Sequence, residues 1–288
     1  MHACGHDGHT TMLLGAAREL AQSRAFDGTV IVIFQPAEEG GAGAKAMIDD
    51  GLFKRWPVNE VYGMHNRPNL EVGNFTINSG PIMGSVDVID IVIDGVGGHA
   101  ASPHHTIDPI PVTAALIQAI QTLTARTIDP LDSAVISITT IHGGDAFNVI
   151  PQSIKLTGTV RTLREEVRDH VEERLTRAVQ GIADAFGAKA TLDYQRNYPV
   201  TVNHEHETEL AALAAEAVAG AERVTRDMPA TLGGEDFAFM LNEVPGAMIN
   251  IGNGPSANLH HPKYDFNDDV IAWGSSYWTT LVRQRLPA

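Results

Sequence analysis

Between residues 86 and 194, strand and helix patterns follow one another in the order β-α-β-β-α-β. The run 86–94 alternates apolar and polar residues, imperfectly, as a half-buried strand does. Further strands are predicted over 134–141, 153–162 and 188–194, and amphipathic helices over 107–126 and 163–186. This order is the split-βαβ or ferredoxin-like unit, which is a complete small domain in its own right. We therefore expect an independent α+β domain in the middle of the chain.

The sequence on either side of this unit has a different pattern. Residues 29–34 (TVIVIF) are a continuous apolar run, which is typical of a strand covered on both faces in an α/β sheet. Helices are predicted over 8–22, 205–219 and 268–286, and a second buried strand over 247–251. The prediction is a discontinuous α/β domain, formed by 1–82 and 196–288, with the ferredoxin-like α+β (βαββαβ) domain inserted at 83–195.

The charge of the chain limits its partners. Lys and Arg number 20 against 35 Asp and Glu, a formal net charge of -15, which argues against nucleic acid or an anionic membrane as the main partner. An anionic small substrate remains compatible, because one or two cations can reverse the field inside a cleft. The single cysteine, the lack of a signal-peptide pattern and the lack of a membrane-length apolar run favour a cytoplasmic protein.

Side chains that bind metals are concentrated in the first nine residues, MHACGHDGH. Cys4 and His6 can reach one site because the chain can bend at Gly5. A lone cysteine is more often a small buried hydrophobe, but the surrounding histidines reverse those odds. Asp7 could accept the other ring N–H of a ligand histidine. A thiolate and imidazoles close together are ligands for a divalent metal of borderline softness.

Two acidic residues and a histidine follow predicted strands. Glu38 and Glu39 come just after the run 29–34 and Pro36, and His65 ends a short strand predicted over 60–65. Adjacent acids are usually a solvated face, but ligands bind beyond the carboxyl ends of strands in such sheets. One carboxylate could bind metal while the other accepts a proton from water. A late loop, 253–266, carries His260.

The inserted domain has its own polar residues. His99 is flanked by glycines after a strand, Asn148 lies in the stretch FNVIP, and Arg161 ends a strand. For each of these residues alone, a structural role (a turn, a capped loop or a surface cation) is about as good an explanation as a functional one. Together they offer a donor for an oxyanion in His99, and a fork for a carboxylate in Arg161 with Asn148.

Taken in order, these motifs resemble those of the M20 metallopeptidase family, in its amidohydrolase branch. That branch includes hippurate hydrolases, N-acyl-amino-acid amidohydrolases and plant auxin-conjugate hydrolases. The motifs that carry the resemblance are MHACGHDGH, QPAEEGG, GMH, GGHAA, FNVIP, GTVR, GGEDF and LHHPKY, from Met1 to the last helix.

The resemblance implies a hydrolase that cleaves N-acyl amino acids with two divalent metal ions, of Mn, Zn, Co or Ni. It implies the metal ligands Cys4, His6, Glu39, His65 and His260. Glu38 would be the general base, and His99 would reach the scissile carbonyl. Asn148 and Arg161 would hold the substrate carboxylate. The inserted domain would act as a lid and as the dimerisation surface of a homodimer.

Two alternatives stay open. A dipeptidase or carboxypeptidase of the same family would require a free amino group on its substrate. A non-catalytic metal-binding or dimerising remnant is the other, because family members carry a segment before the cysteine motif that includes the first strands of the catalytic sheet. This chain starts at the motif, so the sheet is expected to lack those strands.

Overall fold

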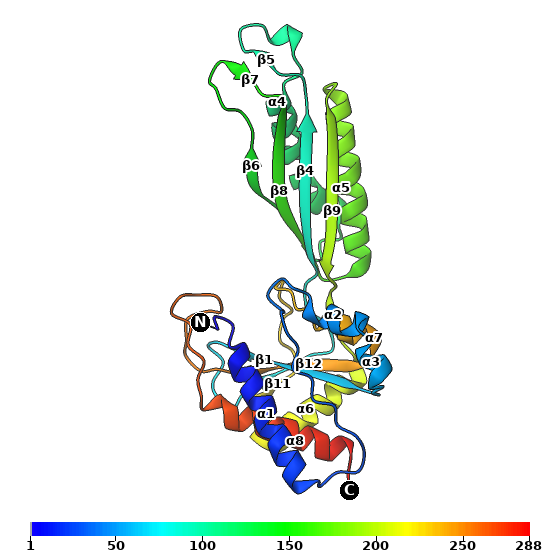
Figure 1. Ribbon diagram of the computed structural model, residues 1–288, viewed down its shortest axis with the longest axis vertical. Helices are drawn as coiled ribbons and strands as arrows, with labels where there is room; N and C mark the ends of the chain where they lie inside the picture. The colour runs from blue at the N-terminus through cyan, green and yellow to red at the C-terminus, as the bar shows by residue number, and fades with distance from the viewer. Residues whose placement is uncertain (1) are drawn as a thin grey trace. The chain divides into compact units, whose positions relative to one another are not determined.

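The computed structural model describes residues 2–288, so Met1, the first residue of the predicted segment 1–82, lies outside the described residues. The chain divides into two compact units (Figure 1). One unit comprises the residues up to Ile82 together with Val202–Pro229 and Asp236–Ala288, and the other comprises Met83–Thr201 and Ala230–Glu235. We refer to them as the outer and the inserted unit.

The inserted unit is built on a four-stranded antiparallel sheet. Its strands are β4 (Val86–Asp94), β6 (Ala134–His142), β8 (Ser153–Thr162) and β9 (Lys189–Tyr198), in the order β6-β8-β4-β9. The helices α4 (Pro109–Thr127) and α5 (Glu165–Ala185) connect them, and Asp108 caps α4 by accepting a hydrogen bond from the Ile110 N–H. Short elements β5 (Gly98–His99), η1 (Pro103–His105) and β7 (Val149–Ile150) complete the unit.

Alternation along the strands gives this sheet one buried face. Ile89, Ile91 and Ile93 of β4 are fully buried and pack with Leu116 of α4 and Leu175 of α5 in one apolar core. Both helices therefore cover the same face of the sheet, as Figure 1 shows. The register pairs Asp87 with Val160 at one end of β4 and β8, and Asp94 with Ser153 at the other.

The outer unit has a second sheet, in the order β1-β12-β2-β11. The strands are β1 (Val61–Arg67), β2 (Phe75–Thr76), β11 (Val224–Thr225) and β12 (Gly246–Gly252). The helices are α1 (His6–Ser23), α2 (Gly43–Asp49), α3 (Leu52–Arg55), α6 (Glu205–Ala219), α7 (Ala238–Glu243) and α8 (Val270–Arg285), with η2 at Ala221–Arg223. Strands β3 (Gly80–Met83) and β10 (Thr201–Asn203) form a separate two-stranded sheet.

Helices α1, α6 and α8 cover one face of the outer sheet. Met12 of α1, Ala211 of α6 and Tyr277 of α8 share one core with Met64 of β1. Gly63 alternates with Met64 along β1, so a Cβ at Gly63 would point to the opposite face, where it would meet the ring of Phe237 at the start of α7. The strands β1 and β12 run parallel, so their carboxyl ends meet at one edge of the sheet. The loop that carries His260 follows β12 at that edge.

The strand predicted over 29–34 is not formed in the structure. No strand within the described residues pairs with this run, and Phe34 is 47% exposed. A β-strand is defined by hydrogen bonds to a neighbour, so an apolar, β-branched run is not sufficient to make one. The prediction was wrong at this element because strand pairing depends on residues far away in the sequence.

Among the described helices, none combines the length and the apolar character that crossing a lipid bilayer requires.

Candidate metal centre

Six of the predicted site residues lie together in the outer unit. Their possible ligand atoms form three overlapping groups in which all the atoms are within 4.8 Å of one another. These groups are Cys4 with His6 and His65, Cys4 with Glu39 and His260, and His6 with Glu38 and Glu39. The structure thus brings together sulfur, nitrogen and oxygen donors from four separate segments. This donor set fits a divalent ion of borderline softness.

The N-terminal segment reaches the cluster through a glycine turn. Gly5 has φ +79°, and a Cβ there would overlap the hydroxyl of Tyr264 and the side chain of Asn66. Only glycine fits such a position without strain. The buried Cys4 precedes this turn and His6 follows it, at the start of α1. The turn therefore aims two donors at one point.

His65 is oriented by its neighbour. Its Nδ1–H donates to the carbonyl oxygen of Asn66 at 2.7 Å, and a carbonyl can only accept, so the proton is on Nδ1. The other ring nitrogen, Nε2, lies 3.4 Å from the sulfur of Cys4 and presents its lone pair to the cluster. A hydrogen bond on the far nitrogen is the usual way in which proteins fix a ligand histidine.

Asn66 is buried beneath the cluster and makes several hydrogen bonds there, although the sequence did not predict a role for it. Its Nδ2–H donates to the carbonyl oxygen of Cys4 at 2.7 Å, and its Oδ1 accepts from the hydroxyl of Tyr264 at 2.9 Å. Its backbone N–H donates to His9 Nε2 at 2.9 Å, so His9 supports the site and does not offer that nitrogen to it. The available signals were the position of Asn66 next to His65 and of Tyr264 within LHHPKY.

The acidic residues lie between the histidines. His6 Nε2 is 3.8 Å from a carboxylate oxygen of Glu38, and His260 Nε2 is 3.6 Å from one of Glu39. The backbone N–H of His260 donates to the carbonyl oxygen of Ala3 at 2.7 Å. This bond ties the late loop to the N-terminal segment and brings the two ends of the site together.

Burial and charge shift the proton affinities in this cluster. The pKa of Glu38 is raised to about 7, first by burial and then by the carboxylates of Glu39 and Asp236. Burial lowers the pKa of His65 to about 4 and also lowers the pKa values of His6 and His9. Near pH 7 these imidazoles are therefore neutral, which is the form that binds metal, while Glu38 is poised to gain or lose a proton.

These two pKa shifts make the folding stability depend on pH in opposite directions. Glu38 binds its proton more tightly in the folded state. Its contribution to folding stability is therefore fully present below its unfolded pKa of 4.5, and it is lost as the pH rises through about 7. His65 binds its proton more weakly when folded, so its contribution is present above 6.5 and is lost as the pH falls through about 4.

Asp7 lies where a different role was expected. It is exposed, and its carboxylate accepts a hydrogen bond from the Gly8 N–H at 3.0 Å. The ring proton of His65 is held by the carbonyl of Asn66 instead, because that carbonyl is adjacent in the strand and already buried. For His65 the supporting contact is thus made by the backbone, and a contact of Asp7 with another ligand histidine stays a prediction.

The three predicted residues of the inserted unit fall into two places. His99 and Asn148 are neighbours, since His99 pairs with Val149 and the Ala100 N–H donates to the carbonyl oxygen of Asn148. Arg161 lies near the other end of β8, opposite Val135 and beside the start of β4. The length of β8 puts roughly 25 Å between the end near Asn148 and the end near Arg161. Asn148 and Arg161 of one chain therefore cannot bind the same carboxylate.

Comparison with known proteins agrees with this chemistry. The model of peptidase family M20/M25/M40 matches residues 1–284. N-acetylcysteine deacetylase of Bacillus subtilis is 39% identical over 283 residues, which cover 98% of this chain and 73% of that protein. Hippurate hydrolase of Campylobacter jejuni is 38% identical over 286 residues, 99% of this chain and 74% of that protein.

A solved structure shares the fold. The crystal structure of the Bacillus subtilis YXEP protein, described as a dinuclear metal binding peptidase from the M20 family, superposes with a TM-score of 0.85. It is 36% identical to this chain, and the match covers 99% of this chain and 73% of the other. The chain belongs to the M20 peptidase family, and the resemblance seen in its motifs is confirmed. It is a metal-dependent amidohydrolase of that family with a mixed α/β fold.

Proposed function

We propose that the chain hydrolyses N-acyl amino acids, of the hippurate or N-acetyl kind, to a carboxylate and a free amino acid. The observation that carries the proposal is the convergence of Cys4, His6, Glu39, His65 and His260, with Glu38 grouped with His6 and Glu39. Relatives that act on N-acetylcysteine and hippurate support this substrate class. The dipeptidase or carboxypeptidase alternative keeps some support, because the solved relative is described as a peptidase.

The five residues would hold two divalent ions. Cys4, His6 and His65 form one group of donors and Cys4, Glu39 and His260 another, so Cys4 belongs to both. The donor types are compatible with Mn, Zn, Co or Ni. When bound, such ions would lower the pKa of a water in the site and polarise the scissile carbonyl.

Glu38 is the proposed general base. It takes a proton from the attacking water as the oxygen adds to the amide carbon. It then gives this proton to the amine nitrogen as the C–N bond breaks. A base with a pKa near the working pH is suited to both transfers, and a carboxylate kept from bulk water by its neighbours has such a value.

We further propose that the inserted unit is a ferredoxin-like domain, 83–195, that acts as lid and dimerisation surface. The sheet order β6-β8-β4-β9, with α4 and α5 on one face, supports the ferredoxin-like assignment. His99 would contact the scissile carbonyl, and Asn148 and Arg161 the substrate carboxylate. Because Asn148 and Arg161 are far apart in one chain, sharing one substrate would require two copies, as in a homodimer.

The test compares substrates at equal concentration with added Mn, Zn, Co or Ni. Hydrolysis of hippurate and N-acetyl amino acids, with little turnover of the free dipeptides, is the expected result. Preference for free dipeptides would favour the peptidase alternative. Bound metal without turnover of either class would favour a non-catalytic remnant.

Replacing a proposed ligand is expected to reduce metal binding. His65→Ala removes a nitrogen donor that is already neutral and oriented, so the affinity for zinc should fall by roughly 100-fold or more. The matched control is His206→Ala, an exposed histidine on α6, which should bind zinc as the parent does. Titration with a chromophoric chelator measures both. Equal affinities would remove His65 from the ligand set.

A further inference from the structure

One acidic motif has no role in the reaction described so far. The stretch Gly233-Gly234-Glu235-Asp236 leads to α7, and the side chain of Asp236 is fully buried. Its Oδ1 accepts a hydrogen bond from Gln35 Nε2 at 2.5 Å, and its Oδ2 accepts from the backbone N–H of Ala44 at 2.9 Å. A buried carboxylate needs such donors, and charge-assisted bonds of this type are among the stronger ones.

The two donors lie on either side of one short segment. Gln35 precedes residues 36–43, which we call the glutamate loop because it carries Glu38 and Glu39, and Ala44 follows it in the first turn of α2. The contact is long-range, since Asp236 is 201 residues from Gln35 and 192 from Ala44. A single side chain thus closes both ends of the loop.

The backbone of the glutamate loop requires such support. Ala37 and Ala42 have φ values of 54° and 49°, in the left-handed region that side chains rarely adopt. A Cβ on Gly43 would overlap the carbonyl oxygen of Pro36, so the loop folds back tightly on itself. Conformations of this kind cost about 1–3 kcal/mol each and persist only where the surrounding structure enforces them.

We propose that Asp236 is a positioning residue that holds the glutamate loop in the conformation that presents Glu38 and Glu39 to the metal centre. The inference rests on the proposed function for its catalytic consequence, but its structural part concerns the metal-free chain alone. Asp236 touches neither substrate nor metal in this account. It acts through the backbone of Ala44 and the side chain of Gln35.

The first test is made without metal or substrate. In Asp236→Ala the N–H of Ala44 loses its acceptor, so its hydrogen exchange in the metal-free protein should be faster by at least roughly tenfold. In the metal-loaded enzyme the same variant should lose about 10²-fold in kcat with little change in KM, because displaced carboxylates impair chemistry more than substrate capture.

Conservative variants separate positioning from a general loss of stability. Asp236→Asn keeps an acceptor for the Ala44 N–H, and the amide of Gln35 can turn to accept from the new Nδ2–H. Of the two measurements, hydrogen exchange at Ala44 should therefore stay close to that of the parent. Glu243→Ala, an exposed acid at the end of α7, should leave both unchanged. If Asp236→Ala does not fold, Gln35→Met, which removes one of the two bonds, should give an intermediate loss in both measurements.

Failure of the positioning role and failure of the proposed function would give different results. Unchanged exchange at Ala44 in Asp236→Ala, or in Gln35→Met if that variant replaces it, would overturn the positioning role whatever the substrate proves to be. Faster exchange with unchanged kcat would also overturn it. A parent enzyme without N-acyl hydrolysis would refute the substrate assignment, and the kcat comparison would then be made on the substrate class that is turned over.

Discussion

Replacing Glu38 by glutamine should lower kcat by roughly 10²- to 10⁴-fold, the range that a general base contributes. Glutamine has nearly the shape of glutamate but cannot take a proton from water. Glu38 lies 3.8 Å from His6 and next to Glu39, so the substitution changes one proton acceptor within an otherwise intact group of donors. Metal content should therefore stay close to that of the parent.

The measurement combines steady-state hydrolysis of an N-acyl amino acid with metal analysis of the same samples. Glu39→Gln is the matched control, because it makes the same chemical change at the adjacent position. It should lose metal as well as turnover, since Glu39 is proposed to be a ligand. Parent-like turnover in Glu38→Gln would remove Glu38 from the role of base. Loss of metal in that variant would make it a ligand instead.

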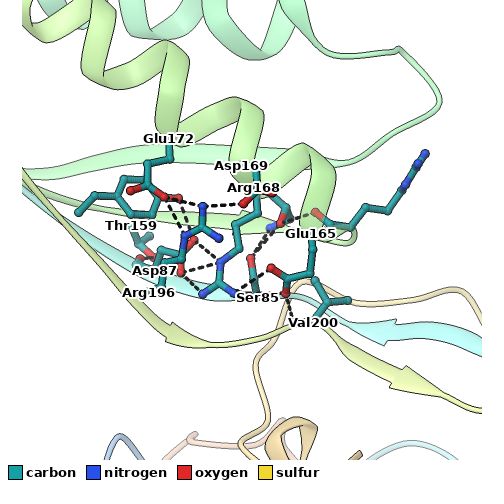
Figure 2. Close-up of polar contacts among 12 residues, drawn as sticks. Ser85, Asp87, Thr159, Glu165, Arg168, Asp169, Glu172, Arg196 and Val200 are labelled. Carbon is teal, nitrogen blue, oxygen red and sulfur yellow. Dashed lines mark hydrogen bonds and ion pairs between the residues drawn. The ribbon is translucent and has the colours of Figure 1, made fainter. Parts of the chain in front are cut away.

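The largest effect on stability is expected from a buried ion pair in the inserted unit (Figure 2). Asp87 of β4 is fully buried, and its carboxylate accepts hydrogen bonds from Arg168 Nε, at 3.0 Å to Oδ2, from Arg168 Nη2, and from the Tyr194 hydroxyl at 2.8 Å. Asp87→Asn would leave the buried guanidinium with only the partly exposed carboxylate of Glu165, 3.2 Å away, as a counter-charge. Removing one partner of such a pair costs about 3–5 kcal/mol.

The same strand provides the control. Asp90, three residues along β4 on the other face, pairs with the exposed Lys155 at 3.0 Å, and pairs of that kind contribute about 0–1 kcal/mol. All three tryptophans, Trp56, Trp273 and Trp278, belong to the outer unit. Urea unfolding followed by circular dichroism and by tryptophan fluorescence therefore separates the units. Equal free energies of unfolding for Asp87→Asn and Asp90→Asn would contradict this account of the pair.

Local patterns in the sequence predicted the individual elements well. The strand 86–94 and the helix 205–219 have the predicted bounds, because alternation and helical spacing are properties of consecutive residues. The run 29–34 has the composition of a strand but no partner in the described chain. Partner strands are a property of the whole fold, and composition does not report them.

The metal-binding groups of the site were predictable for chemical reasons, and their supports were not. The chain has one cysteine and 13 histidines, so the clustering of these side chains in motifs is informative. Asn66 and Tyr264 are neutral polar residues that could serve anywhere on a surface, and only the structure reveals that they hold Cys4. The separation of Asn148 from Arg161 follows from the ten-residue strand β8 that lies largely between them.

The central claim is that Cys4, His6, Glu39, His65 and His260 hold the metal ions required for amide hydrolysis. The most direct measurement is a titration of the metal-free chain with zinc or manganese, in which bound metal per chain and hydrolysis of an N-acyl amino acid are followed together. We predict that hydrolysis appears as two ions per chain bind. Full hydrolysis by the metal-free chain would contradict the account. So would a chain that binds no metal even at the highest metal concentration of the titration.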